Sequence, residues 1–309
     1  SGPTGEGTYT TSVSFTTGQS TTTLTTNLKR AETTTLSAGD GSISGPTSSN
    51  ITVNAGSFSK LQILVPGESA AAGTATGRTG SPSAQTVGAS FNVTVNAVDD
   101  NWNLLSSGTD VVGITSSDGG ATLPSNAALV SGTRTFSVTL NTAGSQTVTA
   151  SDITQPTRTA NTSPAISVAA GSFVKLQILL PGETANPGSP TGKTGSPTAR
   201  TAGSAFNVTV NAVDANWNLI NTVTDVVGIT SNDTYAVLPA NAALVGGTKT
   251  FSVTLKTAGS ATVTATDIID GTKTLNTSPS TTVNAGTFTK LQVILPGERA
   301  APGFGKTGA

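Results

Sequence analysis

The stretch AFNVTVNAVDANWNL, residues 205–219, contains the pattern that decides the fold. In its first half, apolar side chains occupy every second position, at Phe206, Val208, Val210 and Ala212. Successive side chains of a strand point to opposite faces of a sheet, so this alternation predicts a strand with one buried face. The second half, DANWNL, places Asp, Asn and Asn at alternate positions and raises the question of a metal site.

This stretch belongs to a tandem repeat of 115 residues. SFNVTVNAVDDNWNL at 90–104 precedes it by that distance. AGSFSKLQILVPGE at 55–68 returns as AGSFVKLQILLPGE at 170–183 and as AGTFTKLQVILPGE at 285–298. No insertion or deletion separates the two full copies, which indicates a tandem duplication of one structural unit.

The repeat predicts two complete domains, 55–169 and 170–284, flanked by partial ones. Residues 1–54 look like the C-terminal part of a diverged repeat, because GTYTTSVSFTTGQSTTTLT at 7–25 is similar to the corresponding end of the first complete repeat. Residues 285–309 match the N-terminal strand of a further repeat. We therefore expect either a segment of a longer array or chains that complete one another's open ends.

Other parts of the repeat show the same period of two. In KLQILLPGE at 175–183, Leu176 and Ile178 face one side, and we expect Lys175 to be solvated on the other. TAGSATVTATD at 257–267 predicts a tight glycine turn between two neighbouring strands. About seven short strands per repeat favour an all-β fold: antiparallel β-sandwich domains in a linear array.

The strings FNVTVNAVDANWNL, ATLPSNAALVSGTRTFSVTL and TAGSQTVTASD resemble the bacterial immunoglobulin-like repeats of large cell-surface and secreted proteins. The similarity covers nearly all of 55–284. That family usually has Gly where Trp102 and Trp217 stand, in a D-x-N-G-N turn. The resemblance implies tandem immunoglobulin-like domains that serve as an extracellular spacer, adhesive stalk or fibre, without catalysis and without indicating a ligand.

The composition argues against several classes of function. Charged residues make up 10% of the 309 residues and the net charge is −1, so nothing favours nucleic acid or an anionic membrane as a partner. The chain has no Cys and no His, which removes thiolate sites and the commonest general base. We expect no enzyme activity, because no nucleophile motif and no paired carboxylates in an apolar setting occur. No apolar run has the length of a membrane span.

The Asp-x-Asn-x-Asn segments allow two interpretations. Alternate oxygen ligands begin a calcium loop, but the EF-hand Gly and Glu are replaced by Leu104 and Asp110. The other interpretation is a turn in which Asp and Asn side chains bond to their own backbone. The two Trp residues beside them cover a sandwich end or an inter-domain contact, or are exposed for sugar binding. No cofactor other than this calcium is expected. The candidate ligands are Asp99, Asn101, Asn103, Asp214, Asn216 and Asn218.

Six Asn-x-Ser/Thr triplets are candidates for N-glycosylation. The alternation places two of them, Asn92 and Asn207, on the outer face of a strand. The six are Asn50, Asn92, Asn161, Asn207, Asn232 and Asn276.

These patterns predict a structural subunit or segment of an extracellular bacterial filament or cell-surface stalk. Leu291, Val293 and Leu295 form an apolar strand with no domain of its own, so strand exchange between half-repeats would provide a route to a polymer. Its partners would then be copies of itself. The alternative is an adhesin or carbohydrate-binding surface protein, in which the repeats act as spacers and binding modules for surface glycans.

Overall fold

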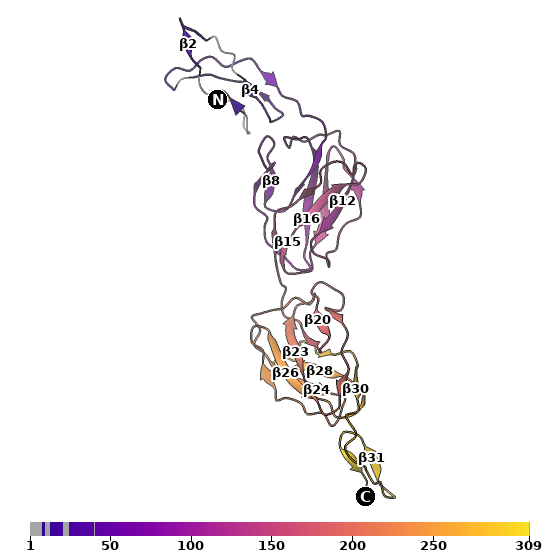
Figure 1. The fold of residues 1–309 in the computed structure, drawn as a ribbon. Coiled ribbons are helices and arrows are strands. Elements are labelled where there is room, and N and C mark those ends of the chain that lie inside the picture. The colour runs from indigo at the N-terminus through magenta and orange to yellow at the C-terminus, as the bar shows by residue number, and fades with distance from the viewer. Residues whose placement is uncertain (1–7, 10–12, 21–24, 40, 309) are drawn as a thin grey trace. The chain divides into compact units, whose positions relative to one another are not determined.

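The computed structural model describes residues 8–9, 13–20, 25–39 and 41–308, which form strands, turns and bends (Figure 1). Residues 7, 10–12 and 21–24 of the stretch 7–25 lie outside the described residues, as does Ala309. The predicted all-β fold class is confirmed. A helix long and apolar enough to cross a membrane is not found among the described residues.

The strands are short and are distributed along the whole described chain. In the first 169 residues they are β1 (Thr8–Tyr9), β2 (Phe15–Thr16), β3 (Gln19–Ser20), β4 (Thr26–Asn27), β5 (Thr33–Thr34), β6 (Ile51–Thr52), β7 (Lys60–Leu64), β8 (Glu68–Ala70), β9 (Arg78–Gly80), β10 (Gln85–Thr86), β11 (Ser90–Val98), β12 (Val111–Ser116), β13 (Ala127–Ala128), β14 (Thr133–Thr139), β15 (Gly144–Gln146), β16 (Val148–Asp152), β17 (Asn161–Thr162) and β18 (Ile166–Ala169).

The later strands follow the same order. They are β19 (Lys175–Leu179), β20 (Glu183–Ala185), β21 (Lys193–Gly195), β22 (Arg200–Thr201), β23 (Ala205–Val213), β24 (Val226–Ser231), β25 (Ala242–Ala243), β26 (Thr248–Thr254), β27 (Gly259–Ala261), β28 (Val263–Asp267), β29 (Asn276–Thr277), β30 (Thr281–Asn284), β31 (Arg299–Ala301) and β32 (Gly305–Thr307).

The chain forms two compact units. Unit 1 consists of Ser1–Gln85, Ala89–Thr139 and Ser145–Val168, and unit 2 consists of Thr86–Gly88, Leu140–Gly144 and Ala169–Ala309. One turn that the sequence assigns to the repeat 55–169, Leu140–Gly144, therefore packs as part of unit 2.

Unit 2 contains a two-layer sandwich. One layer is the antiparallel sheet β19-β23-β26. The other contains the sheet β25-β24-β28-β29 together with β22-β30-β27, in which β22 is parallel to β30 (Figure 1). The alternating apolar side chains of both layers meet in one buried core, to which β23 contributes Phe206, Val208 and Val210, and β26 contributes Phe251 and Val253. The pattern of period two therefore produces the face that the sequence predicted.

Unit 1 contains the same two sheets, β14-β11-β7 and β13-β12-β16-β17. Their registers repeat those of unit 2 at a distance of 115 residues: Thr94 lies opposite Leu64, and Thr209 opposite Leu179. The predicted immunoglobulin-like β-sandwich architecture is confirmed for both copies.

Two local expectations are wrong. Gly259 makes the predicted turn with φ 137°, but the flanking strands do not pair, because β26 pairs with β23 and β27 with β30. At this turn the chain therefore crosses from the layer that contains β26 to the layer that contains β27.

The outer face of β19 is also not solvated. Gln177 is 1% exposed and its Nε2 donates to the Gly192 carbonyl at 2.8 Å, while its Oε1 accepts from Asn211 Nδ2 at 2.9 Å. Gly192 lies in the segment that joins β20 to β21. The hairpin formed by these two strands therefore covers the face of β19 that the alternating pattern predicted to be exposed to solvent. Lys175 at the start of the strand is half-buried, with its Nζ 2.8 Å from the Ala215 carbonyl and over the Trp217 ring.

Candidate functional site

The Asp-x-Asn-x-Asn loop of unit 1 is organised around the buried carboxylate of Asp99. Its oxygens accept hydrogen bonds from the backbone N–H groups of Gly56 at 2.7 Å, Asn101 at 2.8 Å and Asn103 at 2.9 Å. The Nδ2 of Asn103 also donates to it, at 2.9 Å and 3.2 Å to the two oxygens. An Asp side chain that bonds to the backbone two residues further on is the signature of an Asx turn.

Unit 2 repeats this geometry around Asp214. Its carboxylate accepts from the N–H groups of Gly171 at 2.9 Å, Asn216 at 2.8 Å and Asn218 at 2.9 Å. The Nδ2 of Asn218 donates at 3.1 Å and 3.2 Å. Both copies of the loop thus use the first Asp as an acceptor for N–H groups, and the last Asn is held against it.

Burial and hydrogen bonding act in opposite directions on Asp99. Burial raises the pKa of its carboxyl, but the hydrogen bonds from Gly56, Asn103 and Asn101 favour the charged form more strongly, so that the pKa lies below its ordinary value. The carboxylate is therefore ionised near neutral pH and acts as a fixed acceptor.

Trp102 and Trp217 adopt the left-handed conformation, with φ 66° and φ 69°. A bulky side chain rarely adopts positive φ, and glycine is the residue that does so without steric cost. Each ring packs on a glycine of the neighbouring hairpin, Gly77 or Gly192, where a Cβ would collide with the indole. The Trp residues thus close the outer hairpin onto the sheet.

A lysine lies over each indole ring. Lys60 Nζ is 3.7 Å from the ring centroid of Trp102 and Lys175 Nζ is 3.4 Å from that of Trp217, distances at which a cation–π attraction operates. Burial lowers the pKa of Lys60 and of Lys175, although nearby carboxylates partly offset this. With a lysine on the ring and a glycine packed against it, neither indole is presented as an open platform for a sugar.

The third residue of the motif bonds to a turn from elsewhere in its unit. In unit 1, Asn103 Nδ2 donates to the Lys29 carbonyl at 2.8 Å, and Asn103 Oδ1 accepts from the N–H of Ala31 at 2.7 Å. In unit 2, Asn218 Nδ2 donates to the Asn141 carbonyl at 3.0 Å, and Asn218 Oδ1 accepts from Ala143 at 2.8 Å. The two asparagines are 4% and 2% exposed.

This contact also sets the register of the N-terminal segment. LKRA at 28–31 occupies on Asn103 the place that LNTA at 140–143 occupies on Asn218. The predicted similarity of 7–25 to the end of the first complete repeat stays a prediction, since residues 7, 10–12 and 21–24 lie outside the described residues.

The middle residues of the motif are the least engaged. Asn101 is exposed, and Asn216 is half-buried with its Nδ2 3.4 Å from Asn141 Oδ1. The structure thus brings the first and third candidate ligands together but leaves the second outside. A calcium ion at either Asp would compete with the N–H donors described above, and the calcium hypothesis stays a prediction.

The glycosylation candidates fall into two groups. Asn50, Asn92, Asn207 and Asn232 are exposed. Asn161 and Asn276 are half-buried, and their Oδ1 atoms accept from the backbone N–H of Ile63 and Ile178, both at 2.9 Å. The outward orientation predicted for Asn92 and Asn207 is confirmed, while modification itself stays a prediction.

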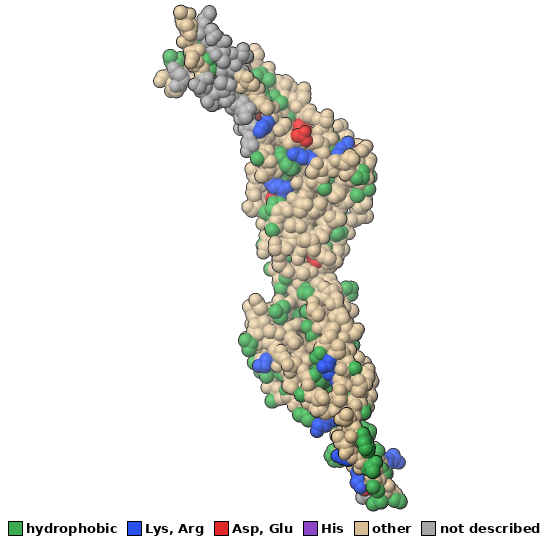
Figure 2. Space-filling model, in the orientation of Figure 1, with side chains coloured by type: hydrophobic (Ala, Val, Ile, Leu, Met, Phe, Trp, Pro, Cys, Tyr) green, Lys and Arg blue, Asp and Glu red, His purple; other side chains and the backbone are tan. Residues whose placement is uncertain are grey.

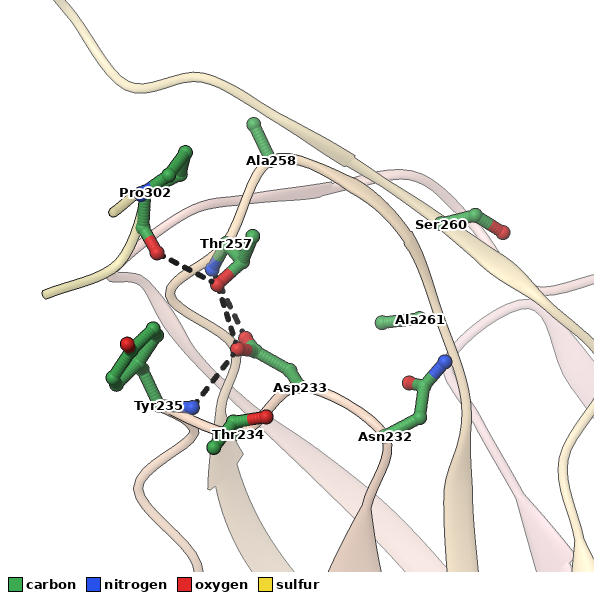
Figure 3. Close-up of a pocket in the computed structure, with 9 residues that line it drawn as sticks. All are labelled: Asn232, Asp233, Thr234, Tyr235, Thr257, Ala258, Ser260, Ala261 and Pro302. Atoms are coloured by element: carbon green, nitrogen blue, oxygen red, sulfur yellow. Dashed lines mark hydrogen bonds between the residues drawn. The ribbon is translucent and has the colours of Figure 1, made fainter. Parts of the chain in front are cut away.

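A second cluster, not anticipated from the sequence, surrounds Asp233. Its carboxylate accepts from the N–H groups of Lys256 at 2.6 Å and Thr257 at 3.0 Å, and from the Thr257 hydroxyl at 2.8 Å. The same hydroxyl oxygen lies 3.2 Å from the Pro302 carbonyl, so its single proton is shared between two acceptors. A hollow of about 270 Å³ adjoins this cluster (Figure 3). The signal in the sequence is weak, since only an Asp before a turn points to it.

The segment 285–298 lacks the strand that its sequence forms in the two complete copies. Leu291 is 85% exposed and Val293 73%, whereas Leu176 and Ile178 are 0% exposed. Figure 2 shows hydrophobic side chains gathered on this C-terminal segment. Beyond it, Ala301 is buried and Phe304 stacks on Tyr235 with ring centroids 5.3 Å apart.

These features define a pair of immunoglobulin-like β-sandwich repeats. No protein-family model and no curated protein sequence matches the chain.

Among solved structures, it is similar to the D0-D1 domain of intimin, with 15% identity and a TM-score of 0.26 over 65% of this chain and 94% of that one. Domains 5-6 of the S-layer protein SbsC match at 23% identity and a TM-score of 0.25, over 66% and 93%. A β-glycosidase from Bacteroides vulgatus matches at 8% identity and a TM-score of 0.29 over 74% of this chain, which spans a quarter, 25%, of that enzyme. Similarities at these TM-scores do not identify a function.

Proposed function

We propose that this chain is a structural segment of an extracellular bacterial filament or cell-surface stalk built from tandem immunoglobulin-like domains, with no catalytic role. The observation that carries the proposal is the repetition of the loops in three dimensions: the hydrogen bonds around Asp99 and Asp214 recur at equivalent atoms. Loops that recognise different receptors are expected to diverge, whereas near-identical loops suit a spacer whose task is mechanical.

The exposed segment 285–298 supports a route to polymerisation by strand exchange. Its apolar side chains would be buried if it joined the edge of a sheet in another chain, as Leu176 and Ile178 are buried in β19. An unpaired apolar strand is otherwise prone to aggregate.

Negative-stain electron microscopy of the purified chain tests the proposal. We expect filaments or long rods, and we expect a chain ending at Ala285 to lose end-to-end filaments while its two sandwiches stay folded by circular dichroism. Isolated compact particles under all conditions would argue against the filament. Filaments of unchanged length from the shortened chain would argue against strand exchange.

The hollow beside Asn232 and Tyr235 is the observation that favours the second candidate, an adhesin with surface glycans as partners. Polar and aromatic side chains are the usual lining of a sugar site. Against it, the Asp233 carboxylate is already bonded to Lys256 and Thr257, and the Tyr235 ring is stacked on Phe304. Specific hits on a glycan array, lost on Tyr235→Ala, would reverse the ranking.

A further inference from the structure

Asn103 and Asn218 each form hydrogen bonds with backbone groups of a turn, so the contact does not depend on the side chains of that turn. Asn103 bonds the carbonyl of Lys29 and the N–H of Ala31, and Asn218 bonds the carbonyl of Asn141 and the N–H of Ala143. The first two residues differ between these turns, Lys-Arg against Asn-Thr, while the third is Ala in both. A primary amide both donates and accepts hydrogen bonds, so one asparagine satisfies the carbonyl of the first turn residue and the N–H of the third.

The Asp of the motif fixes which way the amide points. Because Asn218 Nδ2 donates to the Asp214 carboxylate as well as to the Asn141 carbonyl, its Oδ1 must face the N–H of Ala143. The reverse orientation would place an amide oxygen against a carboxylate and a carbonyl. The Asp-x-Asn-x-Asn loop is therefore a preorganised receptor for a turn.

A glycine forms the second half of the receptor. A Cβ at Gly73 would lie 3.0 Å from Arg30 Cβ, and one at Gly188 would collide with the Thr142 hydroxyl. Thr142 Oγ1 also donates to the Pro187 carbonyl at 3.3 Å. The middle residue of the turn thus packs onto a Pro-Gly or Ala-Gly step while the flanking residues bond to the asparagine.

A third turn of this type, Lys256–Ala258, has only the second half of its receptor. Thr257 Oγ1 lies within hydrogen-bond distance of the Pro302 carbonyl (Figure 3). A Cβ at Gly303 would lie 2.6 Å from that hydroxyl, just as a Cβ at Gly188 would collide with the hydroxyl of Thr142. Asp233 holds the turn in shape through the N–H groups of Lys256 and Thr257. Within the part of the chain that the structure describes, the Lys256 carbonyl and the Ala258 N–H make no hydrogen bond.

We propose that the Asp-x-Asn-x-Asn loop is a docking site for the turn of a preceding repeat, and that the turn Lys256–Ala258 is an interaction surface for the same loop of a further repeat of this type. The partner of the turn Lys256–Ala258 is inferred from the two equivalent turns, because in each of them the asparagine of such a loop bonds to the same two backbone groups. This inference deepens the tandem-array proposal and rests on it for its biological setting.

Amide hydrogen exchange measured by NMR on the full chain tests the docking site. We expect the N–H groups of Ala31 and Ala143 to be protected and that of Ala258 to exchange freely. Asn218→Ala should reduce protection at Ala143 by tenfold or more and leave Ala31 unchanged, with Asn103→Ala giving the converse. Asn101→Ala, at an exposed position of the same loop, is the matched control. Protection at Ala143 that survives Asn218→Ala would overturn the docking site.

A second experiment tests the proposed partner and leaves residues 1–284 unchanged. Another copy of residues 170–284 is placed directly after Asn284, in place of residues 285–309, and hydrogen exchange at the Ala258 N–H is measured again. We expect protection to rise by tenfold or more, and to disappear when the asparagine of the added copy that corresponds to Asn218 is replaced by Ala. Unchanged exchange at Ala258 in the extended chain would overturn the proposed partner. Exchange does not depend on filament formation, so this failure is distinct from the absence of filaments in the microscope.

Discussion

The strand β19 and the segment 290–294 have nearly the same sequence and opposite structures. KLQIL at 175–179 pairs with β23 in one layer, and its Leu176 and Ile178 are wholly buried. KLQVI at 290–294 forms no strand, and Leu291 is exposed. A strand obtains its backbone hydrogen bonds from a neighbouring strand, so a sequence with high β propensity remains irregular when no neighbour is present. What differs between the two regions is the partner and not the local sequence.

The largest effect is expected from substitutions in these matched strands. Leu176→Ala removes a buried side chain and should lower the free energy of unfolding of unit 2 by about 2–5 kcal/mol. Leu291→Ala removes an exposed side chain and should change it by less than about 0.5 kcal/mol in dilute, unassembled protein. Urea unfolding followed by circular dichroism measures both. Equal costs at the two positions would show that 290–294 is buried in solution and would break the comparison.

The contact of Lys175 with Trp217 exists in the complete repeat and has no counterpart at Lys290 in the described C-terminal segment. Trp217→Ala should destabilise unit 2, because the ring is lost while the strained backbone remains. Trp217→Gly loses the same ring but relieves the left-handed conformation at φ 69°, so it should be more stable than the Ala variant by about 1 kcal/mol. Thermal unfolding of the two variants measures this difference. An Ala variant at least as stable as the Gly variant would contradict the proposed strain.

The carboxylate of Asp233 should make the folding stability of unit 2 depend on pH in the acidic range. Burial raises the pKa of Asp233, but hydrogen bonds from Thr257, Lys256 and Tyr235 outweigh it, and the pKa lies below the ordinary 3.8. The contribution of Asp233 to the free energy of unfolding is therefore fully present above about pH 4, and it is lost as the pH falls through the lowered pKa of the folded state.

Asp233→Asn should consequently be less stable than the wild type at pH 7 and should lose less stability on acidification. Melting temperatures of both proteins from pH 7 to below the ordinary pKa of Asp check this, with Asn232→Ala as a neighbouring control. Parallel acid profiles for wild type and Asp233→Asn would show that another group controls the response.

The smallest effect is expected from calcium. Because N–H donors surround Asp99 and Asp214, we expect the melting temperature to be the same with a chelator as with added calcium. A rise of several degrees on adding calcium, abolished by Asp99→Asn together with Asp214→Asn, would instead support the metal hypothesis.

Part of the candidate site was accessible from the sequence. The spacing of Asp214, Asn216 and Asn218 predicted either a cation loop or an Asx turn, but it did not indicate that the left-handed residue of the loop is Trp217. What the spacing did not indicate is that Asn218 bonds to Asn141 and Ala143, since those residues are distant in the chain. Asp233 was missed for the same reason, because its partners are the N–H groups of a turn more than twenty residues away.

The sequence by itself determined the all-β class, the buried face of β23 and the repetition of one sandwich, because alternation and copy number are properties of local sequence. Tertiary structure alone decided that Gln177 is buried under a hairpin, that the turn at Gly259 joins two layers, and that KLQVI at 290–294 is not a strand. The physical reason is common to all three: each outcome depends on which distant backbone or side chain satisfies a hydrogen-bonding group or covers an apolar one, and a local pattern does not specify that partner.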